Sequence, residues 1–314
     1  MPAQTVDPRR ALTAAVAAAR EAGQLMRNNL NALKRVNVST QHDIKLELDV
    51  ECQKRIERRL LRAFPGTAIL GEEGVLGDPE AAGRWVVDPI DGTVNFTYGI
   101  PHACVSIAWQ TRVPEGRARL SQPAAAPPNR RHGEHTAPSL RGTVQEFKAR
   151  IPSVNSPVER YQTQVGVVYD PFCDELWTAV RGGPARLNGR AIQVSTRGRL
   201  NEAIISLGFA KNKATLNRML PVFNHLVHRV RKIRIMGAAA LAMVYVASGR
   251  MDAYTEYGIR LWDIAAGGLI LECAGGDFGR QSLPGEHTFA VCATNGRLRA
   301  GRFCSPERQS STKR

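Results

Sequence analysis

The sequence predicts a layered α/β protein. Two observations lead to this prediction. Short apolar runs rich in β-branched residues alternate with longer segments whose apolar residues recur every three or four positions, and turns containing Gly or Pro separate the two kinds. Strands and helices that alternate in this way are typical of layered α/β architecture. With 314 residues, the chain can bury a core as one large domain or as two lobes.

The first third of the chain is predicted to form two helices and then a set of strands. A basic pair and an alanine-rich run open the first helix, and Arg20 and Glu21 interrupt that run. Since one apolar face continues past them to Leu30, we expect an amphipathic helix here and not a secretion signal. The second helix covers 50–64 and ends at Pro65-Gly66. Strands follow at TAILGEEG, RWVVD, ACVSIAWQ and TQVGVVYD.

Residues 113–160 interrupt the alternation, because this segment is rich in Pro, Ala and Arg and has no periodicity. We predict a largely disordered insertion there. Its HGEH stretch at 132–135 lacks the HExxH spacing, so no metal is assigned to it. We expect an N-terminal α+β lobe over 1–190 that contains the insertion, a C-terminal α/β lobe over 191–304, and a flexible tail over 305–314.

The second half continues with strands and helices in turn. After VYDPFCDELWTAVRGGPARLNGRAIQVS, which predicts three strands joined by turns, AIISLGF predicts a strand. A helix over 216–233 tolerates or kinks at Pro221, and a second helix, AAALAMVYVASG, ends at Gly249. MDAYTEYG predicts a strand, and the last helix begins beside Asp263. The final strands are GDFG and HTFAVCATN.

Composition predicts a soluble cytoplasmic protein that does not enter a membrane. No apolar run approaches the roughly 20 residues of a membrane helix. The six cysteines are scattered, with no CxxC pair, which favours reduced thiols over a disulfide framework or a zinc site.

The formal charge of +15 raises the question of nucleic acid. The segment 181–234 holds twelve Lys and Arg against the single acid Glu202. A solvated basic surface, steering of anionic substrates and polyanion binding all remain open, with the first favoured. No RNA-binding signature with interleaved aromatics is present.

The stretch WVVDPIDGTVNF, residues 85–96, carries the chemistry. Asp88 and Asp91 follow an apolar run, and two carboxylates held close together repel unless a cation lies between them or one takes up a proton. Oxygen ligands without a nearby Cys or His suit Mg²⁺ better than zinc. Gly92-Thr93 can expose backbone N–H groups at a helix start, where phosphate oxygens bind. Carboxylates for a metal beside amides for phosphate indicate metal-assisted phosphoryl transfer to water.

These motifs resemble those of the inositol monophosphatase family, within the wider group of Mg²⁺-dependent, lithium-sensitive sugar phosphatases. The resemblance covers nearly all of the chain except 113–160 and the termini. It implies an α/β/α/β/α sandwich of the inositol monophosphatase and fructose-1,6-bisphosphatase type. The matching segments are GEE at 71–73, WVVDPIDGTVNF at 85–96, LWDIAAGGLILECAGG at 261–276 and, more weakly, 233–258.

The resemblance implies the metal ligands. Glu72, Asp88 and the carbonyl of Ile90 match the ligands of a first Mg²⁺ ion, and Asp88, Asp91 and Asp263 match those of a second. An aspartate at a helix start is also commonly an N-cap, so Asp263 has a structural alternative.

The resemblance also implies the catalytic residues. Asp49 and Thr93 match the pair that orients and deprotonates the attacking water. Glu73 is expected to support the metal ligands through hydrogen bonds.

For the substrate, the amides of Gly92, Thr93 and Val94 match those that hold phosphate. Ala239 falls at a backbone position that contacts substrate, and Glu256 matches the acid that accepts hydrogen bonds from inositol hydroxyls.

This sequence departs from the family pattern at two places near the site. Lys45 and Leu46 replace residues of the family's Asp-Leu-Val-Thr-x-x-Asp stretch, although Asp49 is retained. Phe209 and Ala210 stand where inositol-specific members offer a hydroxyl. Both changes bear on substrate choice.

The resemblance implies hydrolysis of myo-inositol 1-phosphate to inositol and phosphate. Histidinol phosphate, fructose 1,6-bisphosphate and 3′-phosphoadenosine 5′-phosphate are the alternative substrates on this fold. Some bacterial members also act on RNA polymerase or ribosome assembly, which keeps an RNA-associated binding role open but not favoured. Family members are often dimers, so a homodimer is also left open.

Overall fold

A computed structural model of the chain describes residues 6–39, 44–113, 160–209 and 212–298. Several of the predictions concern residues that lie wholly or almost wholly outside this description. They are the insertion at 113–160 with its HGEH stretch, the tail at 305–314, Ala210 and the side chain of Lys45. Within them, no helix is both long and apolar enough to cross a bilayer.

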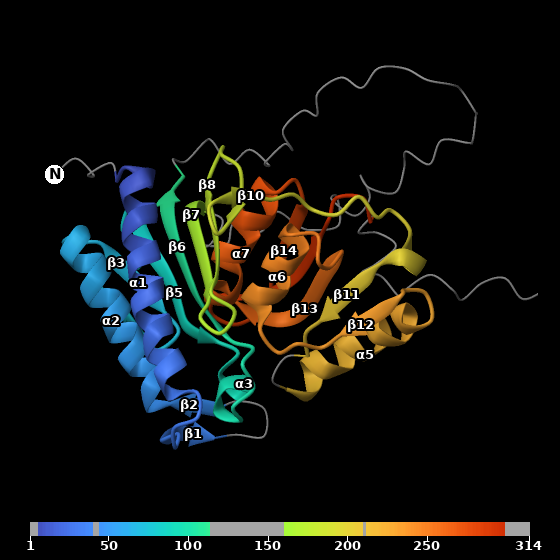
Figure 1. The fold of residues 1–314 in the computed structure, drawn as a ribbon, viewed down its shortest axis with the longest axis horizontal. Coiled ribbons are helices and arrows are strands. Elements are labelled where there is room, and N and C mark those ends of the chain that lie inside the picture. The colour runs from blue at the N-terminus through green and yellow to red at the C-terminus, as the bar shows by residue number, and fades with distance from the viewer. Residues whose placement is uncertain (1–5, 40–43, 114–159, 210–211, 299–314) are drawn as a thin grey trace, which may run out of the picture.

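The elements stack as five layers, α/β/α/β/α (Figure 1). The outer helices α1 (Pro8–Asn29) and α2 (Glu47–Ala63) cover one face of the first sheet. Helices α6 (Ala239–Ala247) and α7 (Leu261–Cys273) lie between the two sheets, and α5 (Lys213–Val227) covers the second sheet on its outer side. The layered sandwich predicted above is confirmed.

The first sheet has eight strands in the order β10-β9-β8-β7-β6-β5-β3-β4. All neighbours pair antiparallel except β3 and β5, which run parallel. Its strands are β3 (Ala68–Gly71), β4 (Gly74–Leu76), β5 (Gly83–Asp91), β6 (Cys104–Arg112), β7 (Tyr161–Asp170), β8 (Glu175–Val180), β9 (Arg186–Leu187) and β10 (Arg190–Ala191).

The second sheet has five strands in the order β12-β11-β13-β15-β14. Its strands are β11 (Ile204–Leu207), β12 (Lys232–Arg234), β13 (Ala253–Arg260), β14 (Asp277–Ser282) and β15 (Thr288–Thr294). Strands β11 and β13 are parallel neighbours, so the residues that directly follow β11 lie beside the middle of β13.

Helix α6 is apolar all round, and α7 is apolar between Asp263 and Glu272, which lie near its two ends; residues of both sheets contribute to the core around the two helices. A helix with no polar face is stable only when it is buried on every side. Gly166 of β7 allows close contact, because a Cβ there would lie 2.8 Å from the carbonyl oxygen of Ala266 in α7. The middle helical layer therefore packs directly on the first sheet.

Five elements differ from the sequence prediction: α5, β12, β4 and the two strands of a small hairpin. The helix predicted over 216–233 is wrong at its end: α5 runs over Lys213–Val227, and β12 pairs in parallel with β11. The β-branched Ile233 suits the strand, and that pairing outweighs the helical pattern. A small hairpin of β1 (Val36–Ser39) and β2 (Ile44–Leu46), and strand β4, were not predicted. Pro221 lies inside α5, as the prediction allowed.

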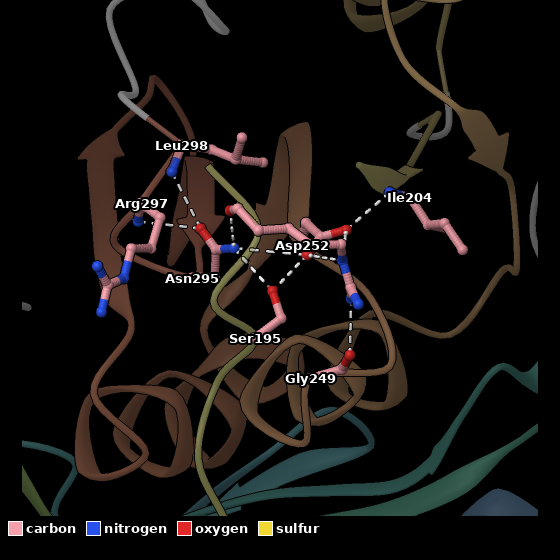
Figure 2. A network of polar contacts seen from close by, with 8 residues as sticks. Ser195, Ile204, Gly249, Asp252, Asn295, Arg297 and Leu298 are labelled. Atoms are coloured by element: carbon pink, nitrogen blue, oxygen red, sulfur yellow. Dashed lines mark hydrogen bonds and ion pairs between the residues drawn. The ribbon is translucent and has the colours of Figure 1, made fainter. Parts of the chain in front are cut away.

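A buried polar network ties the second sheet to the segment that enters it. Asp252 is fully buried and accepts hydrogen bonds from the Ser195 hydroxyl at 2.5 Å and from the backbone N–H of Ile204 at 2.8 Å. Arg197 forms an ion pair with it at 2.8 Å, and the Asn295 side-chain amide donates to Ser195 at 2.8 Å. Figure 2 shows Asp252 at the centre of these contacts. The network fixes the starts of β11 and β13.

Candidate active site

Asp88, Asp91 and Asp263 form one acidic cluster, in which one carboxylate oxygen of each lies within 4.8 Å of the others. Asp88 and Asp91 come from the end of β5, and Asp263 from the first turn of α7. Asp88 and Asp91 are buried and Asp263 is partly buried. Residues 175 positions apart in the sequence, Asp88 and Asp263, thus meet where the first sheet contacts the middle helices.

A β-bulge brings the two aspartates of β5 together. Residues three apart on a regular strand point to opposite faces. Here Asp88 pairs with Ser106 and Asp91 with Cys104, so β5 has one more residue than β6 over this stretch. The extra residue returns Asp91 to the face of Asp88. The strand therefore continues through Asp91, whereas the sequence predicted that it ends at Asp88.

The cluster is electrostatically strained without a cation. Burial, followed by the charges of Glu72, Asp263 and Asp91, raises the pKa of Asp88 well above its usual range. Its Oδ1 accepts the N–H of Ile90 at 3.0 Å, while its buried Oδ2 receives no hydrogen bond from the described residues. A buried carboxylate oxygen without a donor needs a proton or a cation.

Asp91 is held by the start of helix α6. The N–H groups of Ala239 and Ala240 donate to its two oxygens at 3.1 and 2.7 Å. Burial and then Asp263 raise the pKa of Asp91 to about 7, and these two hydrogen bonds oppose that rise. Ala239, predicted to contact substrate through its backbone, thus uses its N–H to orient Asp91.

Cys104 is a residue of this site that the sequence prediction missed. Its Sγ lies 3.6 Å from Asp91 Oδ2, although no cysteine was expected near the acids. Burial and the charge of Asp91 raise the pKa of the thiol well above its usual range, so it is a neutral donor to the carboxylate. The register of β6 against β5 places it there, and register cannot be read from composition.

Glu72 and Glu73 lie in the turn between β3 and β4. The Glu72 carboxylate is near enough to raise the pKa of Asp88. The backbone N–H of Glu73 donates to the side-chain carbonyl oxygen of Gln53 at 2.9 Å, and the Gln53 side-chain amide donates to the Gly74 carbonyl at 3.2 Å. Gln53 of α2 therefore fixes the turn that presents Glu72.

Gly92 follows the cluster with φ of 94°, the left-handed conformation that favours glycine, and caps the five-residue helix α3 (Thr93–Thr97). The hydroxyl of Thr93 donates to the Ile90 carbonyl at 2.9 Å. Val94 has an exposed side chain. The first N–H groups of a helix lack intrahelical acceptors, so this turn presents amides beside the acids.

Asp49 lies at the third position of α2, and its Oδ2 accepts the N–H of Leu46 at 2.7 Å. It is buried, and α3 packs against β2, the strand that leads into α2. Asp49 thus follows the strand against which α3, the helix of Thr93, packs, and each of the two residues has a local hydrogen bond.

Glu256 lies on β13, and its Oε2 accepts a short hydrogen bond from the hydroxyl of Tyr254. Tyr254 is buried, and the charges of Asp91 and Asp263 are among those that raise the pKa of its hydroxyl. The Tyr254 side chain therefore lies between Glu256, to which it donates, and the acidic cluster, whose charges act on its hydroxyl. Tyr254 was not predicted, although alternation along a strand places it on the face of Glu256.

Comparison with known proteins matches the chain to the inositol monophosphatase family over residues 7–120 and 157–301. Among similar proteins are Nus factor SuhB of Pseudomonas aeruginosa, 34% identical over 88% of this chain and 87% of that protein, and Inositol-1-monophosphatase of Rhizobium meliloti, 32% identical over 84% and 83%.

Solved structures agree with this match. The extragenic suppressor protein suhB from Bartonella henselae has a TM-score of 0.74 at 27% identity and covers 95% of this chain and 98% of its own. The inositol monophosphatase from Anabaena has a TM-score of 0.66 at 28% identity, with 93% and 92% covered. The cluster geometry, the matched segments and these likenesses lead to one conclusion: the chain belongs to the inositol monophosphatase family.

Proposed function

We propose that this protein is a Mg²⁺-dependent phosphomonoesterase that hydrolyses myo-inositol 1-phosphate, or a closely related polyol phosphate, to the free polyol and phosphate. The observation that carries the proposal is the acidic cluster of Asp88, Asp91 and Asp263, with its buried and donorless oxygen on Asp88. Membership in the family supports a phosphatase, and Glu256 supports a polyol substrate.

The donor set fits magnesium. Glu72, Asp88, Asp91, Asp263 and the carbonyl of Ile90 offer only oxygen, and Cys104 stays a protonated thiol beside Asp91. These residues would hold the metal, which when bound supplies positive charge for the phosphate and lowers the pKa of water. Glu73 and Gln53 support them through the turn between β3 and β4.

The chain's own residues divide the remaining work. The amides of Gly92, Thr93 and Val94 bind phosphate oxygens, and Asp49 accepts the proton of the attacking water with Thr93 orienting that water. The Thr93 hydroxyl now donates to the Ile90 carbonyl, so it changes its acceptor in this role. Glu256 accepts hydrogen bonds from the hydroxyls of the polyol.

A substrate panel tests this proposal. Phosphate release is measured from myo-inositol 1-phosphate, histidinol phosphate, fructose 1,6-bisphosphate and 3′-phosphoadenosine 5′-phosphate, with Mg²⁺ and with or without millimolar lithium. We expect the highest kcat/KM for the inositol phosphate, no turnover in EDTA, and inhibition by lithium. A strong preference for the adenylate would contradict the polyol assignment.

A groove lined by residues of α1 and α2 favours a second function, binding of RNA. A cavity of about 550 Å³ is lined by Arg9, Arg10, Arg59 and Arg62 together with Phe64. In the described part of the chain these four arginines form no ion pair with an acid. Guanidinium groups without an acidic partner suit phosphate oxygens, and relatives are named Nus factor SuhB.

Retention of a labelled RNA oligonucleotide tests this second function, with Asp88→Asn protein to separate binding from hydrolysis. We expect binding that weakens with salt and is reduced by the Arg9→Ala/Arg59→Ala pair. The matched control is Arg231→Ala/Lys232→Ala, which removes the same charge from the basic segment 181–234. An equal loss in both pairs would indicate nonspecific attraction, and no retention at moderate salt would remove this function.

A further inference from the structure

Glu256 is held from one side by a rigid neighbour on its own strand. Tyr254 and Glu256 are two residues apart on β13, so their side chains project from the same face. The Tyr254 ring is 2% exposed and packs in the core around α6 and α7. Because the ring cannot move without disturbing that core, its hydroxyl gives Glu256 Oε2 a donor at a fixed place.

Glu256 is held from the other side by the backbone at Gly208. This residue directly follows β11, whose Leu207 is the register partner of Thr255 on β13, and its N–H donates to the Thr255 carbonyl at 3.1 Å. A Cβ at Gly208 would lie 1.7 Å from Glu256 Oε2 and 2.2 Å from its carboxyl carbon. The carboxylate therefore occupies the space that any other side chain at 208 would fill.

The requirement for glycine at this position is one of space and not of backbone angle. Gly208 is absent from the residues with left-handed φ, so another residue could adopt its backbone conformation. A side chain at 208 would instead push the Glu256 carboxylate away from its present place, because the clash is with the end of the Glu256 side chain.

We propose that Tyr254 and Gly208 are positioning residues that together fix the Glu256 carboxylate as an acceptor for the hydroxyls of a polyol phosphate, and so set substrate specificity. Neither residue touches the reacting phosphate in this role. This inference rests on the proposed function, because it assigns the substrate's polyol part to Glu256. In this role the hydroxyl of Tyr254 donates to the carboxylate, and the absence of a side chain at Gly208 leaves space for it.

The test compares kcat/KM for myo-inositol 1-phosphate with kcat/KM for p-nitrophenyl phosphate, which carries no polyol. We expect Tyr254→Phe and Gly208→Ala to lower the ratio of the two about tenfold, mainly through KM for the inositol phosphate, since a misplaced acceptor costs affinity only where hydroxyls are bound. Tyr161→Phe removes another largely buried tyrosine hydroxyl, and Gly198→Ala adds a methyl group in open space; both controls should keep the ratio.

A double-mutant cycle separates positioning from a general effect on the fold. In a Glu256→Ala background, the methyl group added by Gly208→Ala has no carboxylate to displace, and the hydroxyl removed by Tyr254→Phe has no carboxylate to hold. Each substitution should therefore change the ratio by less than about twofold. If Gly208→Ala alone does not fold, recovery of folding in Gly208→Ala/Glu256→Ala supports the proposal. Failure of the double variant to recover would overturn it.

Three further results would overturn the inference. An equal loss on both substrates would assign Tyr254 and Gly208 to the fold, and an unchanged ratio would show that they do not act through Glu256. A higher Mg²⁺ concentration for half-maximal rate in Tyr254→Phe would place this residue with the acidic cluster instead. If the wild type hydrolyses the aryl phosphate but not inositol phosphate, the proposed substrate is wrong. The same double-mutant cycle, measured with the best polyol phosphate of the panel, then tests the role of Tyr254 and Gly208 separately.

Discussion

The backbone N–H of Ala240 donates to the carboxylate of Asp91 at 2.7 Å, across 149 residues of sequence. The start of an apolar helix thus holds one of three clustered acids. Backbone donors stabilise the charged form of a carboxylate, while burial and neighbouring acids favour the protonated form. This balance makes the cluster sensitive to protons, and we expect it to make the cluster sensitive to divalent cations as well.

We expect Asp88→Asn to lower kcat/KM by about 100-fold or more, because it removes a carboxylate that the cation needs. The metal-free variant should be at least as stable as the wild type, since one buried like charge is lost. Phosphate release and the melting temperature in EDTA check the two effects. Asp78→Asn, an exposed aspartate in the β4–β5 connection, is the control. A near-normal rate in Asp88→Asn would show that the ligand assignment is wrong.

The stability of the metal-free protein should depend on pH through Asp91. Its pKa is about 7 in the folded protein and about 3.9 in an unfolded chain. Between these values the folded state binds more protons, so this residue's contribution to the free energy of unfolding falls as the pH rises. We expect the stability gain of Asp91→Asn over the wild type in EDTA to be larger at pH 8 than at pH 5. Urea unfolding measures it, and a gain that shrinks with pH would contradict the prediction.

Saturating Mg²⁺ should offset the loss of stability that the metal-free protein undergoes as the pH rises. Because the cation competes with protons for the same carboxylates, the rise in melting temperature on adding Mg²⁺ should be greater at pH 8 than at pH 5. Differential scanning fluorimetry at the two pH values checks this, with Asp263→Asn as a variant in which the rise is expected to be small. An equal rise at both pH values would argue against metal binding by the cluster.

Replacing Asp252 by Ala should cost about 3–5 kcal/mol of stability, because it leaves the Arg197 guanidinium and the Ser195 hydroxyl without their buried acceptor. Glu202→Ala removes a more exposed acid paired with Arg199 and should cost much less stability, because an exposed ion pair contributes little. Chemical denaturation measures both. Similar costs for the two variants would mean that the network around Asp252 adds little.

Replacement of residues 116–158 by a short Asn-Gly turn should leave the first sheet intact. Arg112 and Tyr161 are register partners on antiparallel β6 and β7, and the N–H of Val113 donates to the Arg160 carbonyl at 2.6 Å. The two strand ends are thus already close enough for a hairpin. We expect activity within about twofold and a melting temperature within a few degrees, and a large drop in either would contradict this.

The sequence was sufficient to predict most of the layers and the acids that meet. Helical periodicity and β-branched runs depend on local burial, so α1, α2, α6, α7 and the main strands could be predicted. The motifs at 85–96 and 261–276 identified Asp88, Asp91 and Asp263. Glu256 was identified through the family resemblance alone.

The features that could not be predicted depend on pairing between distant strands. The bulge at Asp88–Asp91, the approach of Cys104 to Asp91 and the parallel partner of β12 are all consequences of register. The relation of Gly208 to Glu256 likewise requires two strands to be side by side. A single sequence shows which residues suit a strand, but not which residue will face them.

Helices α6 and α7 share one core with residues from both sheets, and Asp263 stands in the first turn of α7. A hinge motion between the sheets would expose this shared core to water, so we expect the two sheets and their helices to unfold in a single cooperative transition. Catalytic competence and global integrity would then be lost at the same temperature, with no inactive but still folded species in between.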